Sequence, residues 1–308
     1  AAEPLAYYTG WYGTPFNVPP NTPAAENLAL GATLFNWGIG PWSVYALFGL
    51  GIAFLSLNAG LPLAPRSILY PLIGERAWGR TGHVVDILAI LATVLGLATS
   101  LGLGAQQAAS GLKYLFNMDG GLTTQISFIV IIAFVTVLSV VRGLDRGIRV
   151  LSNFTMALAV ALLGYILFVG PTGDIITSYG AALVQYGGAY LPLSNFVGRE
   201  DTTYFHGWTI FYWAWWISWS PFVGLFLARI SYGRSVREFI AITLLAPLAI
   251  ATIWFSSFGT AAIHQSKNGM GALSDGIGDV SLVLFQLFDV LPIGAIASMF
   301  ALVLLIVF

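Results

Sequence analysis

Long apolar runs constrain the fold of this chain more than any other feature of its sequence. An α-helix needs roughly 20 residues to cross a hydrocarbon core of about 30 Å. Runs of this kind lie near residues 34–57, 85–112, 123–141, 150–170, 207–228 and 238–258, and a seventh begins near residue 292. Such runs are too long for the strands of a membrane barrel, so the sequence predicts an α-helical membrane bundle.

The composition agrees with this interpretation. Hydrophobic residues make up 57% of the chain and charged residues 8%, and the mean hydropathy is +0.84. These values exclude a water-soluble domain of 308 residues. The sequence has no cysteine, which excludes disulfide and thiolate chemistry. We therefore predict one all-α integral membrane domain over residues 1–308.

The basic residues fall mainly on one side of the predicted membrane. If the segment before residue 34 lies outside and every span reverses the side, only Lys113, Arg199 and Lys267 lie outside. The inside then receives Arg66, Arg76, Arg80, Arg142, Arg146, Arg149, Arg229, Arg234 and Arg237. This positive-inside pattern predicts the orientation of the spans. We expect a multi-pass protein of the cell inner (plasma) membrane. Because the chain does not begin with Met and stops within an apolar run, we expect the natural protein to continue beyond both ends.

The segments between the spans give further expectations. Residues 1–33 are rich in proline and are predicted to form an external loop, with only the first five residues ending a helix. The segment around Arg66 is predicted to be a short interfacial helix or a plain linker. Residues 171–206 are predicted to form an amphipathic external piece. Residues 279–289 are too short to span and are predicted to form an external cap or gate helix.

Five tryptophans lie within residues 207–222, in a stretch without charge. At 100° per residue one stripe of the helix carries Trp208, Trp215, Trp219 and Phe222, and an adjoining stripe carries Tyr212 and Trp216. A quaternary ammonium cannot donate hydrogen bonds, so the faces of aromatic rings are the natural way to hold it in a dry site. The alternative is an aromatic belt at the membrane interface, but belts occupy helix ends and this cluster runs through the middle.

A second aromatic set lies in the first predicted span. Trp37, Trp42 and Tyr45 have spacings of five and eight residues, which places them within about 140° of the helix circumference. Gly38 and Pro41 lie between Trp37 and Trp42. They predict that this helical segment is not a straight rod. Two aromatic helices facing each other would build a box.

The second predicted span combines hydroxyl and glycine residues. These are Thr93, Thr99 and Ser100 with Gly96, Gly102 and Gly104. Hydroxyl oxygens can bind a dehydrated cation, and small residues permit close helix packing. Packing alone explains the pattern equally well.

No catalytic constellation emerges from the sequence, so we predict that the chain is not an enzyme and binds no cofactor. His83, His206 and His264 lie at predicted span ends or in loops with no acidic pair or metal-ligand spacing nearby. Asp86, at the start of the second span, is expected to pair with a cytoplasmic arginine.

Several motifs together resemble one family. Residues 207–216 read Gly-Trp-Thr-Ile-Phe-Tyr-Trp-Ala-Trp-Trp and are followed by Ser-Pro-Phe at 220–222 and Ala-Arg-Ile-Ser at 228–231. With Pro-Arg-Ser at 65–67 and Asn-Gly-Met-Gly at 268–271, they resemble the betaine/carnitine/choline transporter (BCCT) family over essentially the whole chain. The resemblance implies twelve spans, ten of them in a five-plus-five inverted-repeat (LeuT-like) bundle. This chain would hold about seven of the twelve, from the tail of the third span into the tenth.

The resemblance also implies site residues. The family's aromatic box matches Trp37, Trp42, Tyr45 and Trp216, and Trp215 and Trp219 would line the route to it. One sodium site matches Thr93 and Phe222, but the second hydroxyl expected four residues after Thr93 is Leu97 here. A second sodium site would lie on parts of the third and tenth spans outside this chain.

The resemblance implies a secondary active transporter that takes up a quaternary ammonium osmolyte by sodium symport. Glycine betaine is the first expectation for the substrate, with choline and carnitine as further options. A homotrimer in the lipid bilayer is expected, with no nucleic-acid partner. The alternatives are a sodium-independent carnitine or γ-butyrobetaine antiporter and a non-transporting osmolyte sensor. A membrane enzyme for choline-like headgroups would need a buried acid/base pair or metal set.

Overall fold

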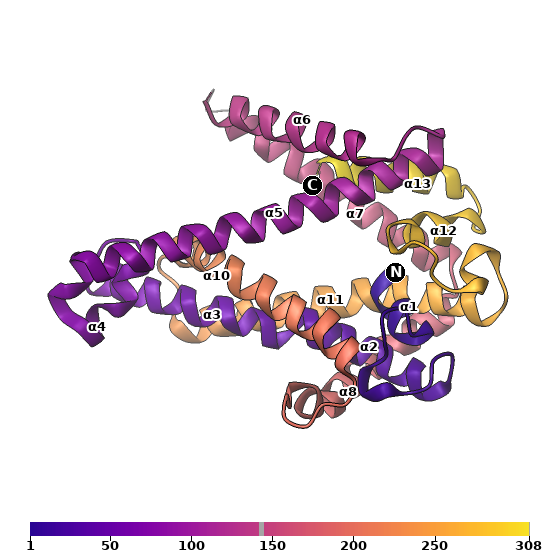
Figure 1. Cartoon of the computed structure of the whole chain (residues 1–308), viewed down its shortest axis with the longest axis horizontal. Coiled ribbons are helices and arrows are strands. Elements are labelled where there is room, and N and C mark those ends of the chain that lie inside the picture. Colours follow the sequence, from indigo (N-terminus) through magenta and orange to yellow (C-terminus); the bar gives the residue numbers. More distant parts are fainter. Residues whose placement is uncertain (142–144, 308) are drawn as a thin grey trace. The chain divides into compact units, whose positions relative to one another are not determined.

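The computed structural model describes residues 1–141 and 145–307, without the side chains of residues 139–140 and 145–148 (Figure 1). Over these residues it is helical and contains no β-strand. The chain forms two compact units. Unit 1 comprises Ala1–Thr33, Ser100–Asp201 and Thr252–Phe308, and unit 2 comprises Leu34–Thr99 and Thr202–Ala251. Arg142 lies outside the described residues, as does the side chain of Arg146.

Among the described residues, five helical segments are long and apolar enough to cross a membrane. They are Pro23–Asn58, Arg80–Phe116, Arg149–Val169, Thr202–Ile230 and Val236–Lys267. They cover five of the seven predicted runs, which confirms a multi-pass helical membrane protein. The other two runs coincide with the shorter apolar helices Leu122–Leu138 and Gly294–Val307. The count of seven spans and the inverted repeat stay predictions.

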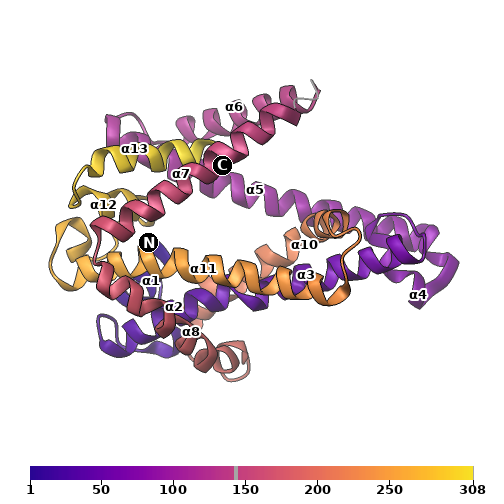
Figure 2. The ribbon, with the colours of Figure 1, turned by 180° about the vertical axis from the view of Figure 1, so that it is seen from behind.

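Unit 2 is organised by the crossing of α3 (Ile39–Ala53) with α10 (Phe211–Ile230), which lie side by side in Figures 1 and 2. Two glycines make this approach close. A Cβ at Gly49 would lie 3.1 Å from the main-chain oxygen of Gly224, and a Cβ at Gly224 would lie 2.6 Å from a ring carbon of Phe48. The two backbones can meet here because neither glycine carries a side chain.

The helix that carries the first aromatic set is broken, as predicted. The helix α2 (Pro23–Trp37) ends before Gly38, whose backbone is not helical (φ −93°, ψ −139°), and α3 begins at Ile39. Pro41 lies in the first turn of α3, where backbone N–H groups have no intrahelical acceptor and a proline is tolerated. After α3 the chain continues through a π-helical turn, η2 (Phe54–Asn58).

The predicted interfacial segment is helical rather than a plain linker. It consists of η3 (Pro65–Leu69), α4 (Tyr70–Ile73) and η4 (Gly74–Trp78). Asp86, near the start of α5 (Arg80–Phe116), accepts hydrogen bonds from Arg66 through Nε at 2.5 Å and through the main-chain N–H at 3.0 Å. The predicted pairing of Asp86 with an arginine is therefore confirmed.

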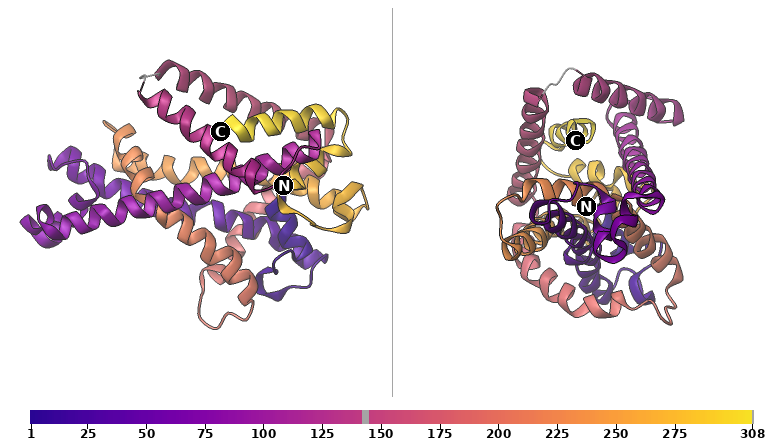
Figure 3. Two further views of the ribbon diagram at one scale, coloured as in Figure 1. Left: turned by 45° about the horizontal axis from the view of Figure 1, so that its top comes forward. Right: turned by 90° about the vertical axis from the view of Figure 1, so that its left-hand side faces the viewer.

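Unit 1 contains most of the remaining elements. They include α1 (Ala2–Thr9), η1 (Pro15–Asn17), α6 (Leu122–Val141), α7 (Asp145–Val169), α8 (Thr172–Ser194), η6 (Gly271–Asp275), η7 (Val280–Leu282), α12 (Val283–Asp289) and α13 (Gly294–Val307). The helix α13, drawn in yellow in Figure 3, packs against both α7 and α12. The prediction of a short helix at residues 279–289 is confirmed by η7 and α12. The predicted external piece at residues 171–206 contains α8, which is not among the candidate spans.

The prediction that residues 6–33 form a loop is wrong over much of its length, because α1 continues to Thr9 and α2 already begins at Pro23. The start of α2 has a clear physical cause. The Thr22 hydroxyl oxygen accepts a hydrogen bond from the Ala25 N–H at 3.2 Å, and Pro23 supplies a fixed φ at the first helical position. The Thr22-Pro23 pair indicates a helix start, but the other prolines of the segment favoured the prediction of a loop.

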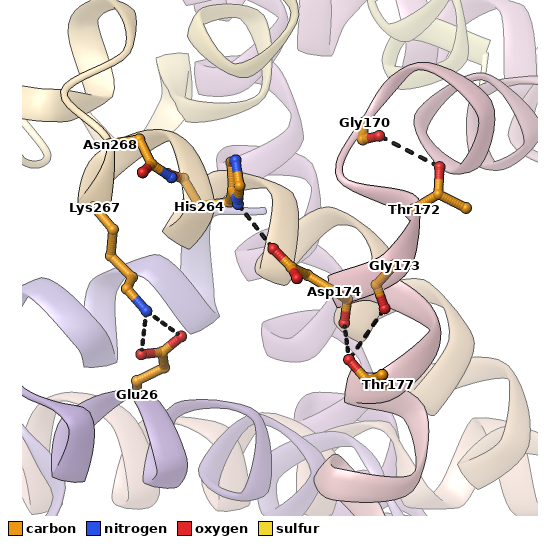
Figure 4. Close-up of polar contacts among 9 residues, drawn as sticks. All are labelled: Glu26, Gly170, Thr172, Gly173, Asp174, Thr177, His264, Lys267 and Asn268. Atoms are coloured by element: carbon orange, nitrogen blue, oxygen red, sulfur yellow. Dashed lines mark hydrogen bonds and ion pairs between the residues drawn. The ribbon is translucent and has the colours of Figure 1, made fainter.

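The prediction for His264 also needs correction. Its Nδ1 lies 2.9 Å from Oδ2 of Asp174, at the start of α8 (Figure 4). The acidic partner is 90 residues away in sequence, so no local spacing revealed it.

Candidate functional site

Four of the predicted binding residues form a connected set of aromatic rings in unit 2. The ring centroids of Trp37 and Trp216 are 5.2 Å apart with an interplanar angle of 88°. Tyr45 lies 5.5 Å from Trp216 at 72°, and Trp42 lies 5.5 Å from Tyr45 at 88°. We call Trp37, Trp42, Tyr45 and Trp216 the aromatic cage. Because neighbouring rings are nearly perpendicular, their faces point in different directions instead of forming one flat stack.

The orientation of Trp216 is fixed by a hydrogen bond that the sequence analysis missed. Its indole Nε1–H donates to the main-chain oxygen of Asn36 at 2.8 Å. Asn36 lies in the last turn of α2, where carbonyl oxygens have no helical donor. The break at Gly38 thus leaves an acceptor beside the cage. The Gly-Ile-Gly-Pro sequence that predicted this break was the signal that could have identified Asn36.

Two further aromatic residues of α10 extend the cage. Trp215 stacks on Trp216 at 6.1 Å and 26°, and it meets Trp37 edge-on at 6.2 Å and 81°. Tyr212, which is buried, lies 5.5 Å from Trp37 and stacks on Trp215 at 6.1 Å. Trp215 was predicted to line the route to the box, and this role stays a prediction. Tyr212 was not predicted as a binding residue, although its i+3 and i+4 spacing to Trp215 and Trp216 pointed to it.

Trp208 stacks on Tyr212, one turn along the chain, at 6.3 Å and 17°. The predicted stripe of Trp208 with Trp215, Trp219 and Phe222 stays a prediction. Phe205–Ile210 form a π-helical segment, η5, between α9 (Thr202–Tyr204) and α10. A π-helix has a wider turn than an α-helix, so a constant 100° per residue fails across it.

Trp219 lies beside the helix that carries the predicted sodium residue. A Cβ at Gly96 of α5 would lie 2.5 Å from the Ser218 hydroxyl oxygen and 3.0 Å from a ring carbon of Trp219. Trp219 is also in ring contact with Phe222 at 5.7 Å. The packing role predicted for Gly96 is confirmed. By contrast, a Cβ at Gly102 would meet no described atom within 4 Å.

The predicted sodium residues lie on these same two helices. Thr93 is one turn before Gly96 on α5, and its hydroxyl donates to the Ala89 main-chain oxygen at 2.9 Å. The lone pairs of the Thr93 oxygen therefore remain for a cation. Phe222 has no side-chain oxygen and could offer only its ring or its carbonyl. Leu97, at the position of the second expected hydroxyl, has 45% of its surface exposed.

The described residues contain no group of three or more His, Cys, Asp or Glu side chains that could hold a metal ion. The Thr93 hydroxyl could offer a sodium ion one neutral oxygen atom. Such ligands suit a hard, weakly bound alkali cation better than a transition metal.

The sequence matches the family model of the BCCT, betaine/carnitine/choline family transporters, over residues 1–308. The chain belongs to the betaine/carnitine/choline transporter family. This confirms the resemblance from the sequence motifs. Because the family consists of transporters, it also supports the prediction that the chain is not part of an enzyme.

Similar proteins of this family carry the names of betaine transporters. Glycine betaine transporter 1 of Vibrio parahaemolyticus is 54% identical over the whole chain, which covers 59% of that protein. A glycine betaine/proline/choline/ectoine transporter of the same organism is 51% identical, with 55% of its length covered. Glycine betaine transporter OpuD of Bacillus subtilis is 39% identical, with 60% covered. The BCCT chain thus spans little more than half the length of these relatives.

Proposed function

We propose that the full-length protein is a secondary active transporter that takes up a quaternary ammonium osmolyte, with glycine betaine as the first candidate substrate. The observation that carries the proposal is the aromatic cage. Its four rings come from both sides of a helix break and from α10, and each well-placed ring contributes about 1–2 kcal/mol to cation binding in a dry site.

The chemistry of the cage supports a quaternary rather than a primary ammonium. None of its four residues is acidic, and the Trp216 N–H is already used by Asn36. A primary ammonium would lose its hydrogen bonds to water and find few acceptors, whereas a trimethylammonium group has none to lose. The names of the relatives include betaine, choline, proline and ectoine, so the substrate range may be tested with these four compounds.

For the coupling ion we propose sodium, held in part by the Thr93 hydroxyl oxygen. The contact of α5 with α10 at Gly96 and Trp219 supports this, because it brings the turn with Thr93 close to the helix that carries the cage residue Trp216. Leu97 favours the alternative, a sodium-independent carnitine or γ-butyrobetaine antiporter, since it removes one expected ligand. We further propose an inner-membrane location and a homotrimer, as expected for the family.

Uptake by the full-length protein in proteoliposomes tests the proposal. Radiolabelled glycine betaine, choline and carnitine would be supplied with and without an inward sodium gradient. Gradient-dependent accumulation of betaine is the expected result. Sodium-independent exchange would identify an antiporter, and betaine binding without any uptake would identify a sensor. If the protein neither binds nor takes up any of the three compounds, the proposed substrate class is rejected.

A further inference from the structure

We propose that unit 1 contains a second binding site for a small zwitterion, in a cavity that shares no residue with the aromatic cage. The cavity has a volume of about 510 Å³. Its wall includes the aromatic residues Tyr8 and Trp11 together with the charged residues Lys267 and Asp275. This volume lies within the usual range for small-molecule sites, roughly 300–1,000 Å³.

The cavity lining includes groups that can bind a cation. The Asp275 carboxylate is exposed and forms no ion pair with a described basic side chain. Trp11 is partly exposed and also lines the cavity. A carboxylate and an indole face attract a quaternary ammonium without requiring it to donate a hydrogen bond.

The Lys267 ammonium can receive an anion. It donates to both carboxylate oxygens of Glu26, at 3.0 Å to Oε1 and 2.7 Å to Oε2 (Figure 4). An ammonium has three N–H donors, so one remains for the carboxylate of a ligand. Glu26 holds the lysine in place at the end of α11 (Val236–Lys267), which limits the entropy lost when a ligand binds.

Main-chain hydrogen bonds order the segments that line the cavity. The Asn21 N–H donates to the Tyr8 oxygen at 2.8 Å, which joins the loop before α2 to the end of α1. Just after α11, the Met270 N–H donates to the Gln265 oxygen at 2.9 Å. Gly10 ends α1 with φ +75°, and a Cβ there would lie 3.0 Å from Pro20. These contacts limit the movement of the backbone that carries the lining residues.

A ligand that matches both charges of the lining, Asp275 and Lys267, carries a quaternary ammonium and a carboxylate, as glycine betaine does. This assignment rests on the proposed function, because it makes the same substrate the occupant of a second site. Such a site would collect the zwitterion at a surface of unit 1 independently of the cage.

Equilibrium binding of radiolabelled glycine betaine to the full-length protein in nanodiscs tests the inference. In Trp216→Ala protein, with the cage disabled, we expect a residual specific site. Adding Trp11→Leu should weaken the residual binding by about fivefold or more, from the loss of one cation–π contact. Adding Asp275→Asn should weaken it as well, and choline, which lacks the carboxylate, should bind this site less tightly than betaine.

Matched controls separate these effects from general damage. Phe196→Leu removes an exposed aromatic ring outside the cavity, and Glu200→Gln removes an exposed carboxylate. Both should leave the residual binding unchanged. Three results would overturn the inference. They are the loss of all specific binding in Trp216→Ala protein, equal effects of the cavity variants and the control variants, and equal binding of choline and betaine at the residual site.

Wild-type uptake distinguishes this failure from failure of the proposed function. If the wild-type protein accumulates betaine but the Trp216→Ala variant binds none, only the second site is rejected. If neither protein binds or transports betaine, the proposed substrate is rejected and the second site with it.

Discussion

The indole N–H of Trp216 donates to the main-chain oxygen of Asn36 at 2.8 Å, and this bond connects the aromatic helix α10 to the broken helix that carries Trp37. The acceptor exists because α2 ends at Trp37, so its last carbonyl groups need donors from outside the helix. The break that provides the acceptor therefore also helps to orient a ring of the cage. An indole held in this way keeps its face in one direction when the substrate leaves.

The cage predicts a specific effect of Trp216→Ala. We expect betaine affinity to fall by at least about 30-fold, since one strong cation–π contact in a dry site is worth about 2 kcal/mol. Trp254→Ala is the control, because Trp254 contacts Phe258 of unit 1 at 4.6 Å and belongs to no cage contact. Betaine binding by the two purified variants gives the measurement. Equal losses would reject the cage assignment.

Trp216→Phe removes the hydrogen bond to Asn36 and replaces the indole face by a smaller aromatic face. The variant keeps an aromatic face but has no N–H donor, so the Asn36 oxygen loses its partner. We expect a loss in betaine affinity that is smaller than that of Trp216→Ala but still about threefold to tenfold, as for one ordinary hydrogen bond. An affinity equal to that of the wild type would show that this bond does not orient the ring.

The contact of α5 with α10 predicts opposite effects for two glycines of the same helix. Gly96→Ala would place its Cβ 2.5 Å from the Ser218 hydroxyl oxygen, whereas Gly102→Ala would meet no described atom within 4 Å. We expect Gly96→Ala to destabilise the protein by about 1–3 kcal/mol through overpacking. Gly102→Ala should be neutral or stabilising by up to about 1 kcal/mol. Thermal unfolding of the solubilised full-length variants measures the difference, and similar unfolding temperatures would contradict it.

The sequence predicted the helices well where hydrophobic length alone decides the structure. It failed at residues 23–33, where the start of α2 depends on one local hydrogen bond between Thr22 and Ala25. It also failed to pair His264 with Asp174, because that contact joins two helices distant in sequence. The length and composition of a segment predict whether it spans the membrane, but they do not predict which polar atoms form hydrogen bonds with each other.

At the candidate site, too, the sequence predicted which side chains gather but not which main-chain atoms they meet. Residue spacing and the family resemblance identified Trp37, Trp42, Tyr45 and Trp216, which the structure joins through ring contacts. The contribution of Asn36 could not be predicted from its side-chain type, since the acceptor is its main-chain oxygen. Such an acceptor depends on the residue at which a helix ends, and helix ends are the least certain part of a sequence-based prediction.

The proposed sodium site predicts reciprocal effects of two substitutions on α5. Thr93→Ala removes a ligand oxygen and should raise the sodium concentration for half-maximal betaine uptake by about tenfold or more. Leu97→Thr supplies a hydroxyl one turn later, at a position with 45% of its surface exposed, and should lower that concentration. Uptake at varied sodium concentration measures both variants. Sodium dependence that neither substitution alters would place the coupling ion elsewhere.

A buried ion pair before α9 predicts a dependence of stability on pH. The Arg199 Nη2 lies 2.6 Å from Oδ2 of Asp201, and only 7% and 1% of the two side chains are exposed. Burial alone would raise the pKa of Asp201, but hydrogen bonds from Arg199 and from the Phe16 N–H, with the charge of Arg199, outweigh burial and lower that pKa. The carboxylate is therefore favoured in the folded protein.

The sign of the effect follows from this lowered pKa. The contribution of Asp201 is fully present above its unfolded-state pKa, which is about 3.9, and is lost as the pH falls through its lower folded-state pKa. Thermal unfolding measured from pH 6 downward should show this loss below about pH 4. Asp201→Asn should destabilise the protein at neutral pH by about 3–5 kcal/mol, because it leaves the Arg199 charge buried without its partner. Glu200→Gln, at an exposed neighbour, should change neither stability nor its pH dependence.

Ser220 and Pro221 of α10 predict a non-additive pair of substitutions. Pro221 has no N–H, so the main-chain oxygen of Ile217 lacks its usual helical donor. The Ser220 hydroxyl donates to that oxygen instead, at 2.8 Å. Ser220→Ala should therefore destabilise the protein by about 1 kcal/mol, as expected for a part-buried acceptor left without its donor.

In a Pro221→Ala background the new Ala N–H can serve the Ile217 oxygen directly, so Ser220→Ala should cost almost nothing. Thermal unfolding of the wild type, both single variants and the double variant completes the cycle, and the coupling energy should be about 1 kcal/mol. Additive effects would show that the hydroxyl does not replace the missing donor. A positive coupling would instead explain how α10 accepts a proline two residues after Trp219 and still continues to Ile230.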